Sequence, residues 1–306
     1  MKSRAGNNLL TQVVFSAILW LCGAVDSADP IVVNGKYAVV VERNRSQMLT
    51  RANYKALASY FKDEYRNAAP FPNIVFDNLF PQSVVEAAAE EFPTFEELCP
   101  ERFIIDRSIM FRNPTQTAKC SSQDEETFSL PILQILHHSR SNMFIGFLEE
   151  LTGISSLFAD HSIFGAGTAA TYRGGKLGVH ADFNRHPIRS SWFRRVSLFL
   201  YLNDDWDESF NGALEFWGDD MSEAVRKIQP TIHRVAMFSN GINSRHGLPE
   251  ELMCPSNRSR NSLALYYYST EPPPNEDIRK RSTFFFGRKG VEAESSYELY
   301  NIPQSV

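Results

Sequence analysis

Hydrophobic residues recur at helical spacing in the first half of the chain and in short, turn-bounded runs in the second half. The helical spacing predicts helices in three segments: 47–66, 82–92 with Ser83 as the N-cap, and 130–153 ending at Gly153. Runs rich in Val, Ile and Phe predict a strand or hairpin over 31–41 and strands over 71–81 and 103–112. The polar segment 114–127 predicts a loop.

From about residue 161 to 270 the chain is a series of short β-like runs broken by Gly, Asn and Asp. The predicted strands are 162–173, 177–183, 195–202, 213–217, 228–232, 234–239 and 261–269. Strands at this spacing, with turn residues between them, are typical of a sandwich or barrel. The motif "STFFFG" (282–287) in the tail predicts an edge strand. Helices followed by a β core make the expected class α+β with a mainly β core.

Composition narrows the class of protein. The 306 residues are 43% hydrophobic and 12% aromatic, which is enough for a sizeable core and unlike a disordered or fibrous chain. The formal net charge of −5 gives no bulk attraction to nucleic acid, so nucleic acid is not an expected partner. Four cysteines without a Cys-x-x-Cys pair argue against a thiolate zinc site.

The N-terminal segment has the pattern of a secretory signal. Lys2 and Arg4 precede an apolar run over 13–25, and small residues follow it. The run is shorter than the ~20 residues that span a bilayer, so we expect a cleaved signal peptide within 1–28, with an uncleaved membrane anchor over 9–25 as the alternative. Both place the protein in the lumen of the secretory pathway or outside the cell. Cleavage would leave three cysteines, enough for one disulfide of unspecified pairing and one thiol: Cys99, Cys120 and Cys254.

His180 and Asp182 are two residues apart in a predicted strand, so both side chains point to the same face. Alone, the pair is either a surface ion pair or two ligands of a metal site. His246, which lies 64 residues after Asp182 and follows an apolar run and a turn-rich segment, adds a third ligand of the right type. Two histidines and a carboxylate form the facial triad that holds ferrous iron and leaves positions open for oxygen chemistry.

Five stretches of the second half carry a family resemblance. They are "YRGGKLGVHADF" (172–183), "RRVSLFLYLNDDW" (194–206), "NGALEFW" (211–217), "SRHGLP" (244–249) and "RNSLALYYYS" (260–269). Together they resemble the Fe(II)/2-oxoglutarate dioxygenases, in particular the prolyl 4-hydroxylase-like branch. The resemblance implies a double-stranded β-helix, or jelly roll, with supporting N-terminal helices. It also implies Fe(II), 2-oxoglutarate as cosubstrate, and ascorbate to keep the iron ferrous.

The resemblance also implies roles for single residues. His180, Asp182 and His246 match the iron ligands and are therefore the expected catalytic centre. Arg260 matches the basic residue that pairs with the distal carboxylate of 2-oxoglutarate, and its planar fork suits a carboxylate. Ser262 and Tyr172 are also expected to bind the cofactor. Arg258 is the alternative to Arg260 for the arginine role.

The expected reaction is hydroxylation of an aliphatic C–H, with peptidyl proline as the leading substrate. The alternatives are an oxygenase of the same type acting on a small anionic metabolite or free amino acid, a jelly-roll metalloenzyme that uses no 2-oxoglutarate, and a non-catalytic jelly-roll binding protein. The Arg-rich loop 183–195 faces either the substrate entrance or solvent, with the acidic segment 202–210 as its partner. His137 and His138, in a predicted helix, are expected to be structural or exposed.

These features divide the chain into five parts. The expected parts are a signal peptide or signal-anchor (1–28), an N-terminal extension (29–70), a helical and strand lead-in (71–160), the jelly-roll core (161–272) and a C-terminal tail (273–306). The oligomeric state is not determined by any of these features.

Overall fold

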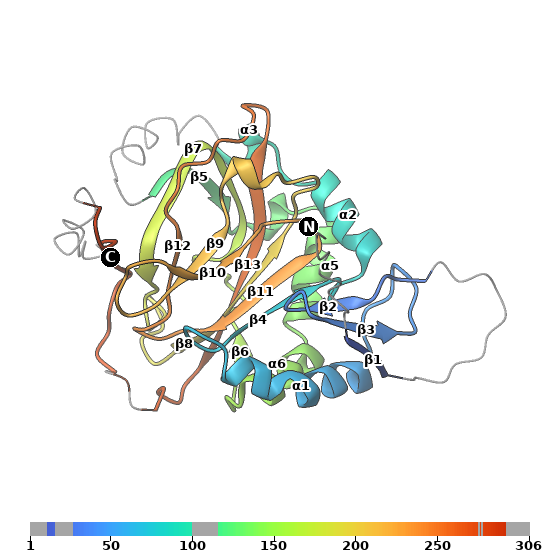
Figure 1. Ribbon diagram of the computed structural model, residues 1–306. Coiled ribbons are helices and arrows are strands. Elements are labelled where there is room, and N and C mark those ends of the chain that lie inside the picture. The colour runs from blue at the N-terminus through green and yellow to red at the C-terminus, as the bar shows by residue number, and fades with distance from the viewer. Residues whose placement is uncertain (1–10, 16–26, 100–115, 275, 277, 292–306) are drawn as a thin grey trace, which may run out of the picture.

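The computed structural model describes residues 11–15, 27–99, 116–274, 276 and 278–291 (Figure 1). Of the apolar N-terminal run, only residues 13–15 lie within the described parts, in strand β1, and the predicted strand 103–112 lies outside them. Among the described residues, no helix is long and apolar enough to cross a membrane. The signal or anchor therefore stays a prediction.

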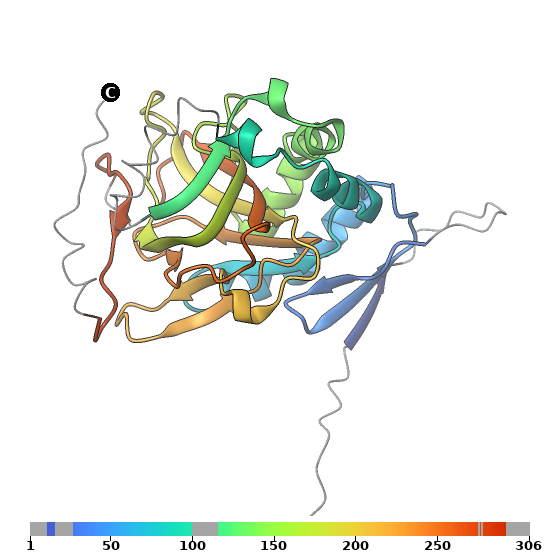
Figure 2. The same ribbon diagram turned by 90° about the horizontal axis from the view of Figure 1, so that it is seen from above.

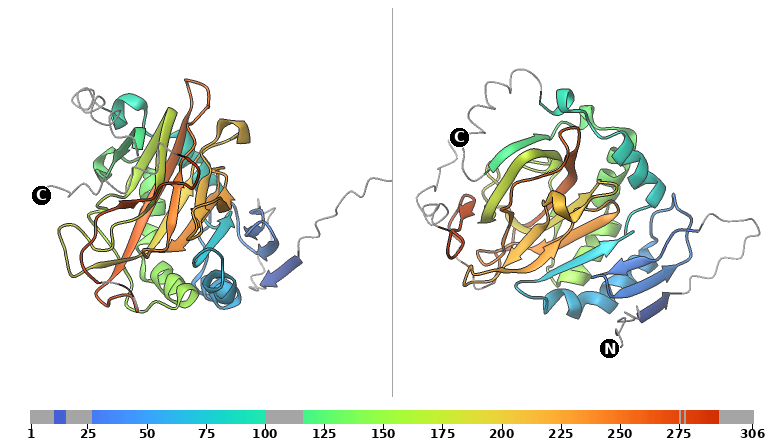
Figure 3. Two further views of the ribbon diagram at one scale, coloured as in Figure 1. Left: turned by 60° about the vertical axis from the view of Figure 1, so that its left-hand side comes forward. Right: turned by 45° about the horizontal axis from the view of Figure 1, so that its top comes forward.

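The strands join one curled sheet, as Figures 2 and 3 show. Its strands are β1 (Thr11–Phe15), β2 (Ile31–Val33), β3 (Tyr37–Val41), β4 (Asn73–Asp77), β5 (Gln116–Ser122), β6 (Phe158–Ala159), β7 (Gly167–Ala181), β8 (Phe193–Tyr201), β9 (Leu214–Trp217), β10 (Ala224–Ile228), β11 (Arg234–Ser239), β12 (Arg245–Leu248), β13 (Ser259–Ser269) and β14 (Phe284–Phe285). The order β1-β3-β2-β4-β11-β8-β13-β7-β12-β9-β10 mixes early and late strands, while β5 and β14 pair with β7 and β6 pairs with β13.

Strand β7 connects the two layers of the jelly roll. Its first part, 167–172, pairs antiparallel with β13, and its last part, 177–180, pairs with β12. The strand therefore leaves the layer of β13, β8 and β11 and enters the layer of β12, β9 and β10. A double-stranded β-helix built in this way confirms the expected fold.

Helices cover one side of this sheet (Figure 1). They are α1 (Arg51–Arg66), α2 (Gln82–Glu90), α3 (Phe95–Leu98), α5 (Leu130–Ser139) and α6 (Asn142–Thr152). Thr50 begins α1 in a capping box with Asn53, and Gly153 ends α6 at a φ of +76°. One apolar core joins α1, α2, α5 and α6 to the sheet, since Phe61, Leu136 and Leu198 belong to the same buried cluster.

The N-terminal hairpin extends the core sheet through β2, which pairs with β4. Asn34 and Gly35 both have positive φ angles (52° and 66°), which the two central residues of a type I′ hairpin turn require. This confirms the hairpin predicted over 31–41. Strand β1 pairs with β3 alone, so it lies at the edge of the sheet.

Four predictions about elements were wrong. The runs 162–173 and 177–183 belong to the single strand β7, and the strand expected over 228–232 lies earlier, at β10. Ser83 lies inside α2, where its hydroxyl donates to the Arg45 carbonyl, and Pro81 is the N-cap. The expected polar loop 114–127 contains β5, whose polar residues hid the strand because apolar residues do not alternate along it. Edge strand β14 confirms the strand predicted in "STFFFG".

Candidate active site

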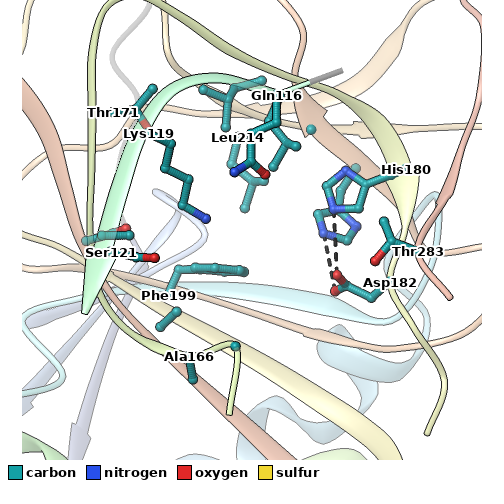
Figure 4. Close-up of a pocket in the computed structure, with 18 of the residues that line it drawn as sticks. Gln116, Lys119, Ser121, Ala166, Thr171, His180, Asp182, Phe199, Leu214 and Thr283 are labelled. Carbon is teal, nitrogen blue, oxygen red and sulfur yellow. Dashed lines mark ion pairs between the residues drawn. The ribbon is translucent and has the colours of Figure 1, made fainter. Parts of the chain in front are cut away.

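The three residues expected to bind metal meet where β7 and β12 run side by side. His180 is in β7, Asp182 follows that strand directly, and His246 is opposite His180 in the register of the two strands. One ligand atom from each lies within 4.8 Å of the others, and all three residues are buried. The Asp182 carboxylate is 3.6 Å from His180 Nε2 and 3.5 Å from His246 Nε2 (Figure 4). The pair His180 and Asp182 is therefore part of a three-residue cluster and not a surface ion pair.

Each imidazole is oriented by its second nitrogen. His180 Nδ1 donates to the Gly178 carbonyl at 2.9 Å, and His246 Nδ1 donates to the Ser244 carbonyl at 2.8 Å. Each ring therefore carries a proton on Nδ1, and the lone pair of its Nε2 atom can bind a metal ion. Burial and the neighbouring His180 lower the pKa of His246 to about 3, so this ring is neutral at pH 7. The donor set of two imidazoles and a carboxylate fits ferrous iron.

A glycine next to His246 allows the two strands to approach. A Cβ on Gly247 would lie 2.8 Å from the Leu177 carbonyl oxygen and 2.9 Å from that of Gly178. These are backbone atoms of β7, so they could move away only if the strand moved. The absence of a side chain at position 247 thus holds His246 within ligand distance of His180.

Arg194 supports the carboxylate ligand from behind. Its Nη2 atom is 2.7 Å from Asp182 Oδ2, and its guanidinium stands 3.4 Å from the centre of the Tyr266 ring. Burial alone would raise the pKa of Asp182, but Arg194 and the two histidines lower it well below its usual range. Asp182 is therefore a carboxylate at every physiological pH, and it remains anchored at one oxygen.

The cluster of His180, Asp182 and His246 opens into a cavity of about 280 Å³. Side chains from β5, β7, β8, β9 and β13 line it (Figure 4). Arg260 and Ser262 enter it from β13, and Tyr201 of β8 lies opposite Ser262 in the strand register. Phe199, Leu214 and Phe285 supply apolar surface. A cavity with a few convergent polar groups between apolar walls is the usual form of a small-molecule site.

The structure separates the two candidate arginines. Arg260 is buried, lines the cavity, and is held by a 2.7 Å bond from its Nε to the Gly212 carbonyl. Arg258 points outward, where its guanidinium donates to the carbonyls of Asp204 and Asp205. Arg260 is therefore the arginine that can reach a ligand in this cavity.

Tyr172 is placed elsewhere. Its ring packs against Phe95 at 4.9 Å, and it is not among the described residues that line the cavity. The neighbouring Thr171 lines the cavity instead, because successive residues of a strand face opposite sides. The expectation that Tyr172 lies near the cosubstrate disagrees with this placement.

The basic loop also differs from expectation. Phe193 already begins β8, and the imidazole of His186, fully buried, lies 3.2 Å from the Asp160 carboxylate. Arg185 donates to the Ser190 carbonyl and Asn184 to the Arg279 carbonyl, so among the described residues these contacts hold the loop to itself, to Asp160 and to the tail instead of to the acidic segment 202–210. Arg195 donates to the Ser269 hydroxyl, away from the metal cluster. Arg194 does line the cavity, as expected for part of this loop, whereas motif reasoning gave no role to Lys119 and Gln116, which line it too.

Comparison with known proteins was made for sequence and for fold. Residues 167–268 match the family model described as the 2OG-Fe(II) oxygenase superfamily, a segment that contains His180, Asp182, His246 and Arg260. No curated protein matches the chain by sequence.

Several solved structures are similar in fold. A prolyl-4-hydroxylase from Pseudomonas putida is 19% identical, with a TM-score of 0.46 over 70% of this chain and 99% of that one. A prolyl hydroxylase from Trichoplax adhaerens, solved with a peptide fragment of the hypoxia inducible factor oxygen degradation domain, is 15% identical, with a TM-score of 0.45 over 71% and 91%. HygX from Streptomyces hygroscopicus, solved with nickel, 2-oxoglutarate and hygromycin B, is 12% identical, with a TM-score of 0.41 over 72% and 88%.

Proposed function

We propose that this chain, whose residues 167–268 match the 2OG-Fe(II) oxygenase superfamily model, hydroxylates an aliphatic C–H bond at the cavity beside His180, Asp182 and His246. The observation that carries the proposal is the buried cluster of two oriented imidazoles and one anchored carboxylate, beside a cavity where the buried Arg260 can bind the cosubstrate. A binding module has no use for that combination, and a metalloenzyme without 2-oxoglutarate has no use for Arg260.

Ferrous iron and 2-oxoglutarate, when bound, supply the oxygen activation that an unactivated C–H requires. The protein's own residues bind and orient. His180, Asp182 and His246 would hold the metal, and Arg194 keeps the carboxylate ligand ionised and in place.

Arg260 binds the distal carboxylate of 2-oxoglutarate with its planar fork. The Ser262 hydroxyl, two residues along the same face of β13, adds a hydrogen bond to it. The apolar walls of the cavity exclude water from the reacting atoms.

A prolyl residue of a peptide is the leading substrate, as the resemblance to the prolyl 4-hydroxylase-like branch implies. A small anionic acid is the second candidate, and a specific observation favours it. The described side chains that line the cavity include four basic groups, Lys119, Lys176, Arg194 and Arg260, and one acidic group, Asp182. We also propose that ascorbate maintains the ferrous state and that the protein acts in the secretory pathway.

Turnover is tested with Fe(II), 2-oxoglutarate, ascorbate and a panel of proline peptides, free amino acids and small acids. Succinate release coupled to a +16 Da product supports the proposal, and alanine at His180, Asp182 or His246 should abolish both. Succinate release that survives all three substitutions would show that the chemistry occurs elsewhere.

A further inference from the structure

Strand β5 brings into the cavity a lysine that the proposed function does not use. Lys119 is in register with Thr171 of β7, and Thr171 is in register with Arg260 of β13. Residues in register on neighbouring strands share a face, so Lys119 and Arg260 stand in one row with backbones about 10 Å apart. Both line the cavity, and Figure 4 shows the Lys119 side chain pointing into it.

Lys119 differs from the other basic groups of the cavity in its contacts with the described residues. Lys176 pairs with Glu251 at 3.4 Å and Arg194 pairs with Asp182 at 2.7 Å. Within the described parts of the chain, the structure gives the Lys119 ammonium neither a hydrogen bond nor an ion pair. Burial, and next the charge of Arg260, lower the pKa of Lys119, so its ammonium is held at a cost in free energy. An anion bound beside it would remove that cost.

An irregularity of the local backbone directs the Lys119 side chain into the cavity. The pairing of β5 with β7 changes register between Thr117 and Lys119, where Ala118 has a positive φ of 47°. Gln116 and Lys119, three residues apart, would face opposite sides of a regular strand, yet both line the cavity. The next residue, Cys120, is bonded to Cys99, which ties β5 to the end of α3.

Gln116, Lys119 and Ser121 therefore form a polar wall on β5, called here the β5 wall. It places an amide, an ammonium and a hydroxyl along one side of the cavity, and the Lys119 ammonium between the other two can donate charge-assisted hydrogen bonds to a carboxylate. Under the proposed function, the metal ligands and Arg260 with Ser262 would hold 2-oxoglutarate, so the β5 wall is left for another ligand.

We propose that the β5 wall binds a carboxylate of the primary substrate, so that the molecule hydroxylated here is an acid. This inference rests on the proposed function and specifies its substrate class. The carboxylate belongs either to an acidic side chain of a peptide or to a free small acid, and both sources present the same group to Lys119.

The test uses the full protein loaded with Mn(II) and saturating 2-oxoglutarate without oxygen, so that binding is measured apart from turnover. The probes are acid and amide pairs: N-acetylproline and its amide, free aspartate and asparagine, and a short Asp-Pro peptide and its Asn-Pro counterpart. We expect the wild type to bind at least one acid about 10- to 100-fold more tightly than its amide. Lys119→Met should remove that preference and Lys119→Arg should retain it. The pair that shows the preference identifies the source.

Lys176→Met is the matched control, because it removes the other cavity lysine, whose charge is already paired. It should keep the wild-type preference. Equal binding of acids and amides by the wild type, or no binding of any acid, overturns the inference. So does a Lys119→Met protein that loses 2-oxoglutarate affinity and keeps its preference for acids, since Lys119 would then serve the cosubstrate. Failure of the proposed function is distinguishable, because then even the wild type would not bind 2-oxoglutarate.

Discussion

Two arginines two residues apart have different surroundings, and this difference predicts different effects on the cosubstrate. Arg260→Ala leaves the distal carboxylate of 2-oxoglutarate without its cationic partner, so its KM should rise by about 30- to 1000-fold, or about 2–4 kcal/mol. Iron binding should persist. Arg258→Ala, which removes only bonds to the carbonyls of Asp204 and Asp205, is the control and should change the KM little. The reverse ranking would transfer the role to Arg258.

The close approach of β12 and β7 at Gly247 predicts that one added methyl group there weakens metal binding. Gly247→Ala would force the backbones of β12 and β7 apart, so His246 would move away from His180. We expect the Fe(II) dissociation constant, measured without oxygen, to rise by about 10-fold or more. Gly218→Ala, whose Cβ would meet its nearest side-chain atoms at 3.6 and 3.7 Å, should bind iron normally. Equal affinities in the two variants would refute the role of Gly247.

The metal ligands were predictable from sequence because strand geometry links positions two apart, and His180 and Asp182 use that spacing. Arg260 was predictable from a motif that places it on the same strand as Ser262. Lys119 and Arg194 were not. Lys119 enters the cavity through an irregular pairing of β5 with β7, and Arg194 reaches Asp182 because its backbone N–H donates to the Asn184 carbonyl, which places the start of β8 beside the segment that follows β7. Tyr172 was expected near the cosubstrate, but its neighbour Thr171 lines the cavity, because a shift of one residue reverses the face of a strand.

At the scale of elements, α1 and α5 meet at Tyr54 and His138, whose hydroxyl oxygen and Nε2 are 2.9 Å apart. Burial lowers the pKa of His138 to about 4, whereas in the unfolded chain it is about 6.5. Between these pH values the unfolded chain binds more protons than the folded one. Stability that is fully present above pH 6.5 is therefore lost as the pH falls toward 4.

We expect the free energy of unfolding of the wild type to fall by about 1–2 kcal/mol more than that of His138→Gln between pH 7 and pH 5. Urea denaturation at the two pH values measures it. His137→Gln is the control, because His137 is exposed and faces Glu125 at 3.6 Å. A His138→Gln protein with the same pH dependence as the wild type would mean that His138 takes up its proton as readily in the folded chain as in the unfolded one.

Elements were predicted best where the pattern of apolar residues reflects one buried face. Leu57 and Phe61 of α1 and Leu136 of α5 are fully buried, and their helices were predicted. Strand β5 was missed because one of its faces lines a polar cavity, so function rather than packing determines its side chains. The length of β7 was missed because Gly174 and Gly175 signal a turn in sequence but lie within the continuous strand that joins the two layers.

At the scale of the whole molecule, β1 forms one edge of the sheet, and we expect the core to be stable without it. Strand β1 pairs only with β3, whereas Val33 of β2 and Val39 of β3 are completely buried. A chain lacking residues 1–26 should melt within a few degrees of the full chain and bind iron equally well. A chain lacking residues 1–41 should be much less stable. A large loss on the shorter deletion would show that β1 supports the fold and would weigh against removal of a signal peptide.

The central claim is that His180, Asp182 and His246 hold ferrous iron together with 2-oxoglutarate. The most direct test is an anaerobic titration of the full chain with Fe(II) and 2-oxoglutarate, followed by visible absorption, because the chelated cosubstrate gives a weak charge-transfer band. We predict the band in the wild type, its loss in His246→Ala, and its recovery at higher 2-oxoglutarate concentration in Arg260→Ala. An unchanged band in His246→Ala, or no band in the correctly folded wild type, would contradict the account.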